Sequence, residues 1–205
     1  MNCEFSTMTF GHWPQGANGA LEPIRWNVLT QENDRLLVLA DKVLDMQPFD
    51  HAAQPVRWEN CSLRQWLQEV FLPQAFTKVE REKIFCNPPS EDPAGDLLWQ
   101  MFGMETATST VADPVFLLSS ADVAQYFPNE NTLFCPGASA DASDYVQERY
   151  GDVIDRNGGT LWWLRSSMSD RPMAYFVSPC DSVGISKIGE GNLQGVRPAM
   201  WLKQE

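Results

Sequence analysis

The run Leu161-Trp162-Trp163-Leu164-Arg165, followed by Gly195-Val196-Arg197-Pro198-Ala199-Met200-Trp201-Leu202, decides the fold of this 205-residue chain. Both runs are rich in aromatic and aliphatic side chains, which is typical of buried strands. We expect the tryptophans to fill a core, because each can bury a large apolar area. A proline inside the second run indicates an edge or a bulge, and the glycine before it indicates a turn.

Two arginines stand inside these strand runs. A cation placed among apolar residues must be paired or hydrogen-bonded, since an isolated buried charge is costly. We therefore expect Arg165 and Arg197 to be held by a carboxylate or by backbone carbonyls, with direct contact to a ligand as the alternative.

Further strands flank these runs along the chain. Residues 24–29 alternate apolar and polar side chains, and the turn-forming residues 31–34 separate them from the apolar run 35–40, which predicts a hairpin. Residues 9–15 read as an edge strand that Pro14 ends. Shorter strands are expected at residues 115–118, 173–177 and 182–186.

Four helices are expected between these strands. Ser62 and Gln65 can form a capping box for a first helix that Pro73 stops. Its apolar residues recur at helical spacing. A second helix begins at Thr77 and a third at Ser119. A fourth spans residues 141–150, with Gly151 in the left-handed conformation that often follows a helix.

These elements predict one α+β domain over residues 1–205, with a mixed or antiparallel sheet assembled from both termini and two to four flanking helices. The Pro-, Gly- and Ser-rich residues 87–112 indicate a surface insertion or long loop.

Charge narrows the classes of partner. The chain has 27 acidic and 15 basic residues, a net charge of −12, so we expect neither nucleic acid nor a membrane as partner. The first residues lack the basic and apolar segments of a secretory signal, which favours a cytoplasmic or virion-associated protein.

Cysteine and histidine residues are sparse. The five cysteines are scattered without a C-x-x-C pair, and only His12 and His51 are present. We therefore expect free buried thiols, with no metal and no cofactor. The acidic residues 89–93 and 141–144 could supply oxygen ligands to calcium. No calcium-loop motif accompanies them, which favours a solvated acidic surface, and calcium binding is the alternative.

Six strings, in this order, resemble a bacterial family of uncharacterised domains. They are FGHWPQ at 10–15, IRWNVL at 24–29, WENCSLRQWL at 58–67, FLLS at 116–119, WWLRS at 162–166 and GVRPAMWL at 195–202. The last two strings are also similar, more distantly, to the C-type-lectin-like domains of formylglycine-generating enzymes. That resemblance implies a C-type-lectin-like fold with a surface of loops and short strands.

The same resemblance makes an enzyme the alternative function. Formylglycine-generating enzymes use two cysteines in their C-terminal half to hold copper, and residues 160–205 contain only Cys180. The related sulfoxide synthases use a histidine-rich site, which the two histidines here do not supply. The sequence therefore predicts no complete catalytic constellation, and the alternative is a related enzyme with a lost or changed metal site.

The favoured function is a non-catalytic module that binds a protein or glycan. Residues 166–194 carry an irregular polar sequence between the two specific strings, as expected where a rigid scaffold displays a recognition surface. The candidate ligand-binding residues are Met168, Ser169, Asp170, Arg171, Met173, Tyr175, Ser178, Asp181, Lys187, Ile188, Glu190, Asn192 and Gln194. Arg171 and Tyr175 are the expected energetic anchors, because arginine and tyrosine dominate interface hot spots.

Domains of the lectin-like type also serve as the diversified binding proteins of diversity-generating retroelements, in which a C-terminal stretch is mutagenised. The position of residues 166–194 before the GVRPAMWL string fits that arrangement. The resemblance thus implies a variable protein whose recognition residues differ between copies.

Overall fold

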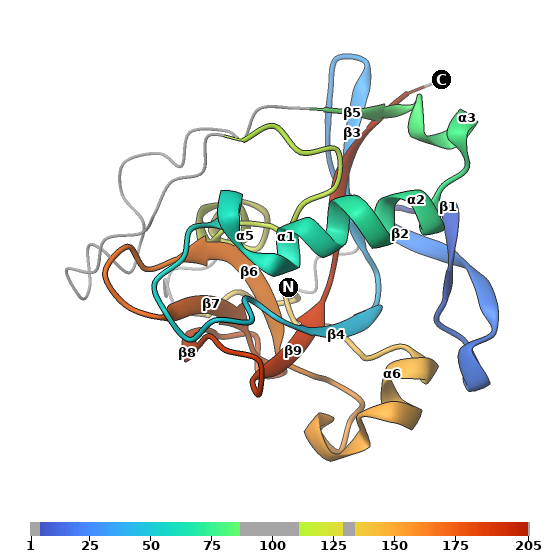
Figure 1. The fold of residues 1–205 in the computed structure, drawn as a ribbon. Coiled ribbons are helices and arrows are strands. Elements are labelled where there is room, and N and C mark those ends of the chain that lie inside the picture. The colour runs from blue at the N-terminus through green and yellow to red at the C-terminus, as the bar shows by residue number, and fades with distance from the viewer. Residues whose placement is uncertain (1–4, 87–110, 129–133, 205) are drawn as a thin grey trace.

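The structure is a computed structural model that describes residues 5–86, 111–128 and 134–204. These residues form two five-stranded sheets flanked by short helices (Figure 1). The first sheet has the order β1 (Thr7–Pro14), β2 (Leu21–Glu32), β3 (Arg35–Ala40), β10 (Ala199–Lys203), β5 (Ile84–Phe85). The second has the order β4 (Asp45–Pro48), β9 (Leu193–Val196), β6 (Trp162–Ser167), β7 (Met173–Val177), β8 (Val183–Lys187). All neighbours are antiparallel except β6 and β9, so the expected α+β class is confirmed.

The first sheet joins segments from both ends of the chain, as the sequence predicted. The β2–β3 hairpin turns at Asn33, which adopts a left-handed φ of 51°. Strand β10 then pairs with β3, placing Met200 opposite Val38, and β1 forms one edge of the sheet. The expected strand over residues 196–202 is divided instead, because Arg197-Pro198 carries the chain from β9 in the second sheet to β10 in the first.

The first helical segment differs from the predicted one at both ends. Helix α1 (Ser62–Trp66) has Cys61 as its N-cap, and the Cys61 Sγ accepts a hydrogen bond from the Arg64 N–H at 3.4 Å. The expected cap, Ser62, donates its own N–H to the Asp50 carboxylate at 2.8 Å, so the tertiary contact moves the helix start by one residue. Pro73 does not stop the helix, because a π turn (Leu67–Phe71) precedes it and leads into α2 (Leu72–Ala75).

Two of the remaining helices keep their predicted starts. Capping boxes are present at α3 (Lys78–Arg81), through Thr77 and Glu80, and at α5 (Ser120–Tyr126), through Ser119 and Asp122. Helix α6 (Asp144–Arg149) lies inside the predicted range but begins after residue 141, because the Ser143 side chain caps it by accepting the Val146 N–H. The left-handed residue expected at Gly151 is wrong, because a 3-10 turn (Gly151–Val153) continues directly from the helix.

The core lies on both faces of the second sheet. Trp162 and Trp163 are consecutive residues of β6, so their side chains point to opposite faces, and both are fully buried. Trp163 packs with the apolar residues of α1, such as Leu63, and Trp162 packs with those of α5 and α6, such as Val123. Both predictions are confirmed, whereas Trp201 is half-buried beneath the guanidinium of Arg35.

Two further expectations concern Gly195 and the predicted insertion over residues 87–112. Gly195 does not form a turn but lies buried within β9, against Val43 and the Leu161 carbonyl. Most of the surface insertion expected over residues 87–112, together with the acidic residues 89–93, lies outside the described residues.

Candidate functional site

The predicted binding residues do not form one continuous face. Strands β6, β7 and β8 are antiparallel neighbours, so consecutive turns alternate between the two ends of the sheet. The β6–β7 turn and the segment after β8 share one end, while the β7–β8 turn, which holds Ser178 and Asp181, lies at the other. The stretch 166–194 therefore supplies two separate surfaces.

Four of the predicted residues are buried and cannot belong to an exposed recognition surface. The exposed fractions are 2% for Met168, 0% for Tyr175, 3% for Ile188 and 2% for Gln194. The sheet has apolar layers on both faces, so alternate strand residues do not reach solvent here. Tyr175 belongs to the second of these layers, with Trp162 and Leu164, and its assignment as a binding anchor is wrong.

At the β7–β8 turn, both predicted residues have structural partners. Asp181 adopts a left-handed φ of 57°, and its carboxylate accepts the Ser139 N–H at 2.7 Å. The Ser178 hydroxyl contacts the Ser182 hydroxyl at 2.7 Å and accepts the Cys180 N–H at 3.2 Å. These contacts close the turn, so the structure gives Ser178 and Asp181 structural roles.

The other end of the sheet brings together three loops, residues 51–57, 169–172 and 187–192, which we call the loop face. The Ser167 hydroxyl donates to the Val56 carbonyl at 2.9 Å, and the Ile188 N–H donates to the Pro172 carbonyl at 2.9 Å. Gly189 lies against Ala53, since a methyl group at position 189 would be 3.4 Å from the Ala53 Cβ. One backbone hydrogen bond therefore joins residues 169–172 to 187–192, while residues 51–57 are held by the Ser167 side chain of β6 and by the contact of Ala53 with Gly189.

Fixed hydrogen bonds hold each loop in shape. The Met168 N–H donates to the Met173 carbonyl at 2.9 Å across the β6–β7 turn. The Asn192 side chain donates to the Ser186 hydroxyl at 2.9 Å and to the Lys187 carbonyl, closing the loop after β8. Met173 itself is half-buried, so it supports the turn more than it extends the surface.

Exposed polar side chains cover the loop face. Ser169, Asp170, Arg171, Lys187 and Glu190 were predicted from the sequence, and all are exposed. The structure adds a segment that the prediction missed, with His51, Gln54 and Arg57 exposed. Turn-forming composition alone could mark residues 51–57 as a loop. Only the long-range pairing of β4 with β9 places them here.

Both strand arginines are structural, as expected. The Arg165 guanidinium lies 3.1 Å from the Asp122 carboxylate and 3.3 Å from the Leu117 carbonyl. The Arg197 guanidinium donates to backbone carbonyls, of which those of Ala40 at 2.7 Å and Ala138 at 2.9 Å are the closest, and it lies over the Trp162 ring. Burial lowers the pKa of Arg197 to about 10, which still leaves it protonated at neutral pH.

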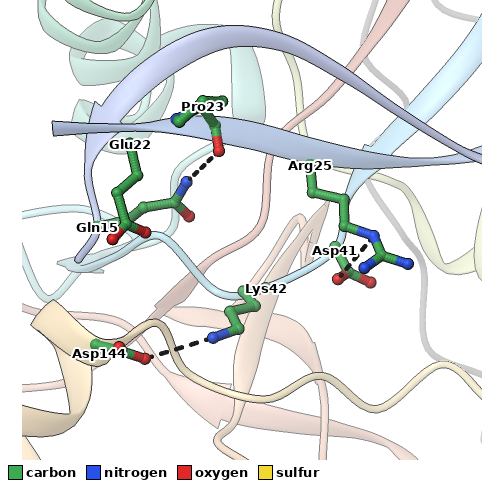
Figure 2. Close-up of a pocket in the computed structure, with 7 residues that line it drawn as sticks. All are labelled: Gln15, Glu22, Pro23, Arg25, Asp41, Lys42 and Asp144. Atoms are coloured by element: carbon green, nitrogen blue, oxygen red, sulfur yellow. Dashed lines mark hydrogen bonds and ion pairs between the residues drawn. The ribbon is translucent and has the colours of Figure 1, made fainter.

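A separate pocket of about 190 Å³ lies between the β1–β2 hairpin and α6 (Figure 2). It is lined by Gln15, Glu22, Pro23, Arg25, Asp41, Lys42 and Asp144. None of the sequence-predicted binding residues lines it, although Asp144 belongs to the acidic run considered for calcium. Asp144 faces the Lys42 ammonium at 3.4 Å.

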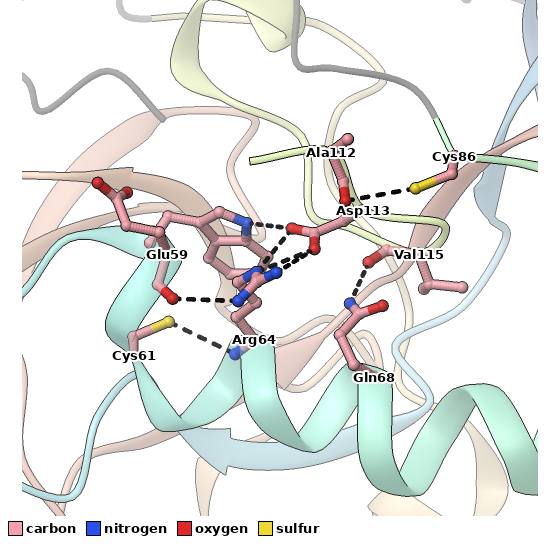
Figure 3. Close-up of polar contacts among 9 residues, drawn as sticks. Glu59, Cys61, Arg64, Gln68, Cys86, Ala112, Asp113 and Val115 are labelled. Carbon is pink, nitrogen blue, oxygen red and sulfur yellow. Dashed lines mark hydrogen bonds and ion pairs between the residues drawn. The ribbon is translucent and has the colours of Figure 1, made fainter. Parts of the chain in front are cut away.

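A buried carboxylate ties the segment after residue 110 to helix α1 (Figure 3). Asp113 is 3% exposed and accepts hydrogen bonds from the Trp58 indole at 2.9 Å and from the Arg64 guanidinium at 2.7 Å. The Asp113 hydrogen bond is the main cause that raises the pKa of Arg64. Gln68 adds a bond to the Val115 carbonyl at 2.7 Å. The side chains of Trp58, Arg64, Gln68 and Asp113 thus hold the segment 111–115 against helix α1.

The thiol in this region is poorly suited to nucleophilic chemistry. Burial raises the pKa of Cys61 to about 12, so the thiolate is scarce at neutral pH. Cys61, Cys86, Cys135 and Cys180 are all free thiols. Across the described ranges, no three His, Cys, Asp or Glu side chains gather as metal ligands would.

Residues 33–204 match the family model of a domain of unknown function, DUF6273. The chain belongs to the DUF6273 family. The family resemblance to uncharacterised domains is thereby confirmed. No curated protein and no solved structure matches this DUF6273 chain. Among the described residues, no helix of the DUF6273 chain has the length and apolar character needed to cross a membrane.

Proposed function

We propose that this DUF6273 chain is a non-catalytic binding module that contacts a partner protein through the loop face. The single observation that carries the proposal is the meeting of three loops with exposed polar side chains at one end of the second sheet, whose central strand β6 is buried along its whole length. Loops on a rigid scaffold are where proteins most often place binding residues. The strands beneath the loops form a rigid support. All residues of β6 are buried, so the exposed side chains come from the loops.

Preformed backbone geometry favours binding. The hydrogen bonds from Ser167 to Val56 and from Ile188 to Pro172 already fix how the loops lie against one another. A partner would then not have to order these segments, which reduces the entropy lost on association.

Charge indicates the kind of partner. The loop face carries three basic side chains, Arg57, Arg171 and Lys187, against two acidic ones, Asp170 and Glu190. The whole chain has a net charge of −12. An acidic partner surface would be repelled by most of this molecule but not by the loop face, so electrostatics would orient the encounter.

The test pairs loop-face substitutions with matched controls. A protein captured by the chain from its source cells is purified, and its Kd is measured against the double variant Arg57→Ala/Arg171→Ala. We expect the affinity to fall by roughly tenfold or more, with the unfolding midpoint unchanged. The control is Arg81→Ala/Arg156→Ala, which removes two exposed arginines elsewhere. Equal affinities for the two double variants, or binding of a glycan alone, would contradict the proposal.

The C-type-lectin-like fold and the diversified binding role are the finer parts of this proposal, and the sequence resemblance supports them. A reverse-transcriptase gene beside this one, with a near-copy of the region encoding residues 166–205, would support diversification. Variation would then be expected at exposed positions such as Ser169, Arg171 and Glu190 and not at the buried Tyr175. A gene neighbourhood that lacks both the reverse transcriptase and the near-copy would contradict the proposed diversified binding role.

A further inference from the structure

The pocket beside α6 offers a second binding site, which shares no residue with the loop face (Figure 2). Its walls come from three parts of the chain: the β1–β2 hairpin, the segment after β3 and the start of α6. Its volume of about 190 Å³ is well below that of sites for drug-sized ligands. The pocket therefore suits only a small molecule.

Hydrogen bonds between the walls hold the pocket in shape. The Tyr145 N–H at the start of α6 donates to the Gln15 carbonyl at 3.0 Å. The Asn18 N–H at the tip of the hairpin donates to the Glu148 carboxylate at 2.7 Å. The Ser143 N–H donates to the Val43 carbonyl at 2.9 Å. These bonds join all three walls, so the site is preformed.

Gln15 supplies a directed hydrogen-bond acceptor. Its side chain is more than nine-tenths buried, and its amide N–H donates to the Pro23 carbonyl at 2.8 Å. That bond fixes the amide orientation and turns Oε1 away from Pro23, into the pocket (Figure 2). Within the described part of the chain, Oε1 accepts no hydrogen bond. An N–H or O–H group of a ligand could donate a hydrogen bond to this oxygen.

The Glu22 carboxylate lies on the same side of the pocket (Figure 2). A methyl group at Gly16 would lie 2.4 Å from the Glu22 Oε1, so this carboxylate lies against the backbone of the hairpin loop. The Glu22 carboxylate and the Gln15 Oε1 are both hydrogen-bond acceptors by their chemistry. Together they form a subsite for a positively charged N–H donor such as an ammonium group.

The two cations of the pocket lie near carboxylates but are not fully engaged. The Arg25 Nε is 3.7 Å from Asp41, and the Lys42 Nζ is 3.4 Å from Asp144. Both distances exceed those of strong charge-assisted hydrogen bonds, and the side chains of Arg25 and Lys42 are 62% and 45% exposed. Arg25 and Lys42 can therefore turn toward an anionic group placed between them.

We propose that this pocket binds a free amino acid in its zwitterionic form. The ammonium group would lie between Glu22 and the Gln15 Oε1, and the carboxylate would face Lys42 and Arg25. A ligand with one charge alone would satisfy only half of the site. The two opposite charges of an amino acid match the two halves at once, and a small side chain suits the limited volume.

A titration with three probes tests the proposal. L-alanine, isopropylamine and propionate share a small carbon skeleton but carry both charges, the cation alone and the anion alone. Backbone amide shifts in nuclear magnetic resonance spectra of the full chain should saturate with L-alanine at a Kd of about 1 mM or below. The shifts should centre on Gln15, Lys42 and Tyr145. Each single-charge probe should bind roughly tenfold more weakly or worse.

Matched variants complete the test. Glu22→Gln removes one exposed charge from the pocket, and Asp34→Asn removes one exposed charge from the β2–β3 turn. The Glu22→Gln variant should lose at least about tenfold in affinity for L-alanine, and Asp34→Asn should bind as the unaltered chain does. Unsaturable shifts with L-alanine, or equal affinities for both variants, would overturn the proposal.

Discussion

The Nε of Arg197 donates a hydrogen bond to the carbonyl oxygen of Ala40 at 2.7 Å, at the point where the chain passes from the second sheet into the first. Ala40 is the last residue of β3, and its own N–H donates to the Pro198 carbonyl at 2.9 Å. The guanidinium also reaches the Ala138 carbonyl and lies 5.1 Å from the centre of the Trp162 ring. One buried side chain thus joins both sheets and the loop before α6.

Replacing Arg197 should therefore destabilise the whole domain. Arg197→Met keeps much of the apolar volume but removes the guanidinium donors to the Ala40 and Ala138 carbonyls, and Ala138 then keeps only the Trp162 indole N–H at 3.2 Å. We therefore expect a loss of roughly 3–5 kcal/mol in the free energy of unfolding. Urea unfolding measures the loss. The exposed Arg171→Met should change stability by less than about 0.5 kcal/mol, and a similarly small change for Arg197→Met would show that the contacts are not stabilising.

Gly195 gives a prediction about close packing. A Cβ at this position would lie 2.6 Å from a methyl group of Val43 and 2.7 Å from the Leu161 carbonyl oxygen. The backbone oxygen cannot move without breaking its bond from the Gly195 N–H at 2.8 Å. Gly195→Ala should therefore cost about 1–3 kcal/mol in thermal or urea unfolding.

Gly191 provides the matched comparison. It is exposed, and a Cβ there would meet nothing within 4 Å, so Gly191→Ala should be neutral or slightly stabilising. Equal unfolding midpoints for the two alanine variants would contradict the packing role of Gly195.

Local signals in the sequence predicted the elements that depend on local interactions. The capping boxes of α3 and α5 and the β2–β3 hairpin are each determined by residues a few positions apart. The start of α1 was missed because its cap depends on Asp50, which lies outside the helix and binds the Ser62 N–H. Tertiary contacts of this kind override a capping pattern.

The candidate site was predicted only in part for a related reason. Period-two alternation identifies an exposed face only when one side of a sheet is open to solvent. The second sheet is covered on both sides, so Tyr175 became core although Arg171, in the adjoining turn, is exposed. The contribution of residues 51–57 depends on the pairing of β4 with β9, which joins segments about 150 residues apart and has no local signal.

Cysteine accessibility gives a chemical prediction. Cys180 and Cys86 are exposed, whereas Cys61 is 2% exposed and burial raises its pKa to about 12. Alkylation by iodoacetamide proceeds through the thiolate, so Cys180 and Cys86 should react in the folded protein at about pH 8 while Cys61 stays unmodified. Peptide mapping by mass spectrometry, with and without urea, checks this. Modification of Cys61 at the rate of Cys180 in the folded protein would contradict its placement as a buried helix cap.

Asp45 in β4 gives a prediction about pH. Burial is the main cause that raises the pKa of Asp45 from 3.8 to about 6, against the opposing effects of the Met46 N–H, the Gln47 side chain and Arg149. Between these two values the folded state binds more protons at Asp45 than the unfolded state does. The contribution of Asp45 to stability is therefore greatest below about pH 4 and is lost as the pH rises through about 6.

Asp45→Asn removes this loss, because the amide is neutral at every pH and its oxygen can still accept the Met46 N–H, which lies 2.7 Å from the Asp45 carboxylate. We expect the variant to be more stable than the unaltered chain by roughly 1–3 kcal/mol at about pH 7.5, with a smaller difference at about pH 5. Urea unfolding at both pH values measures the two differences. Asp152→Asn, an exposed change beyond α6, should give none at either pH. A gain for Asp45→Asn that is equal at both pH values would show that titration of the Asp45 carboxyl is not its cause.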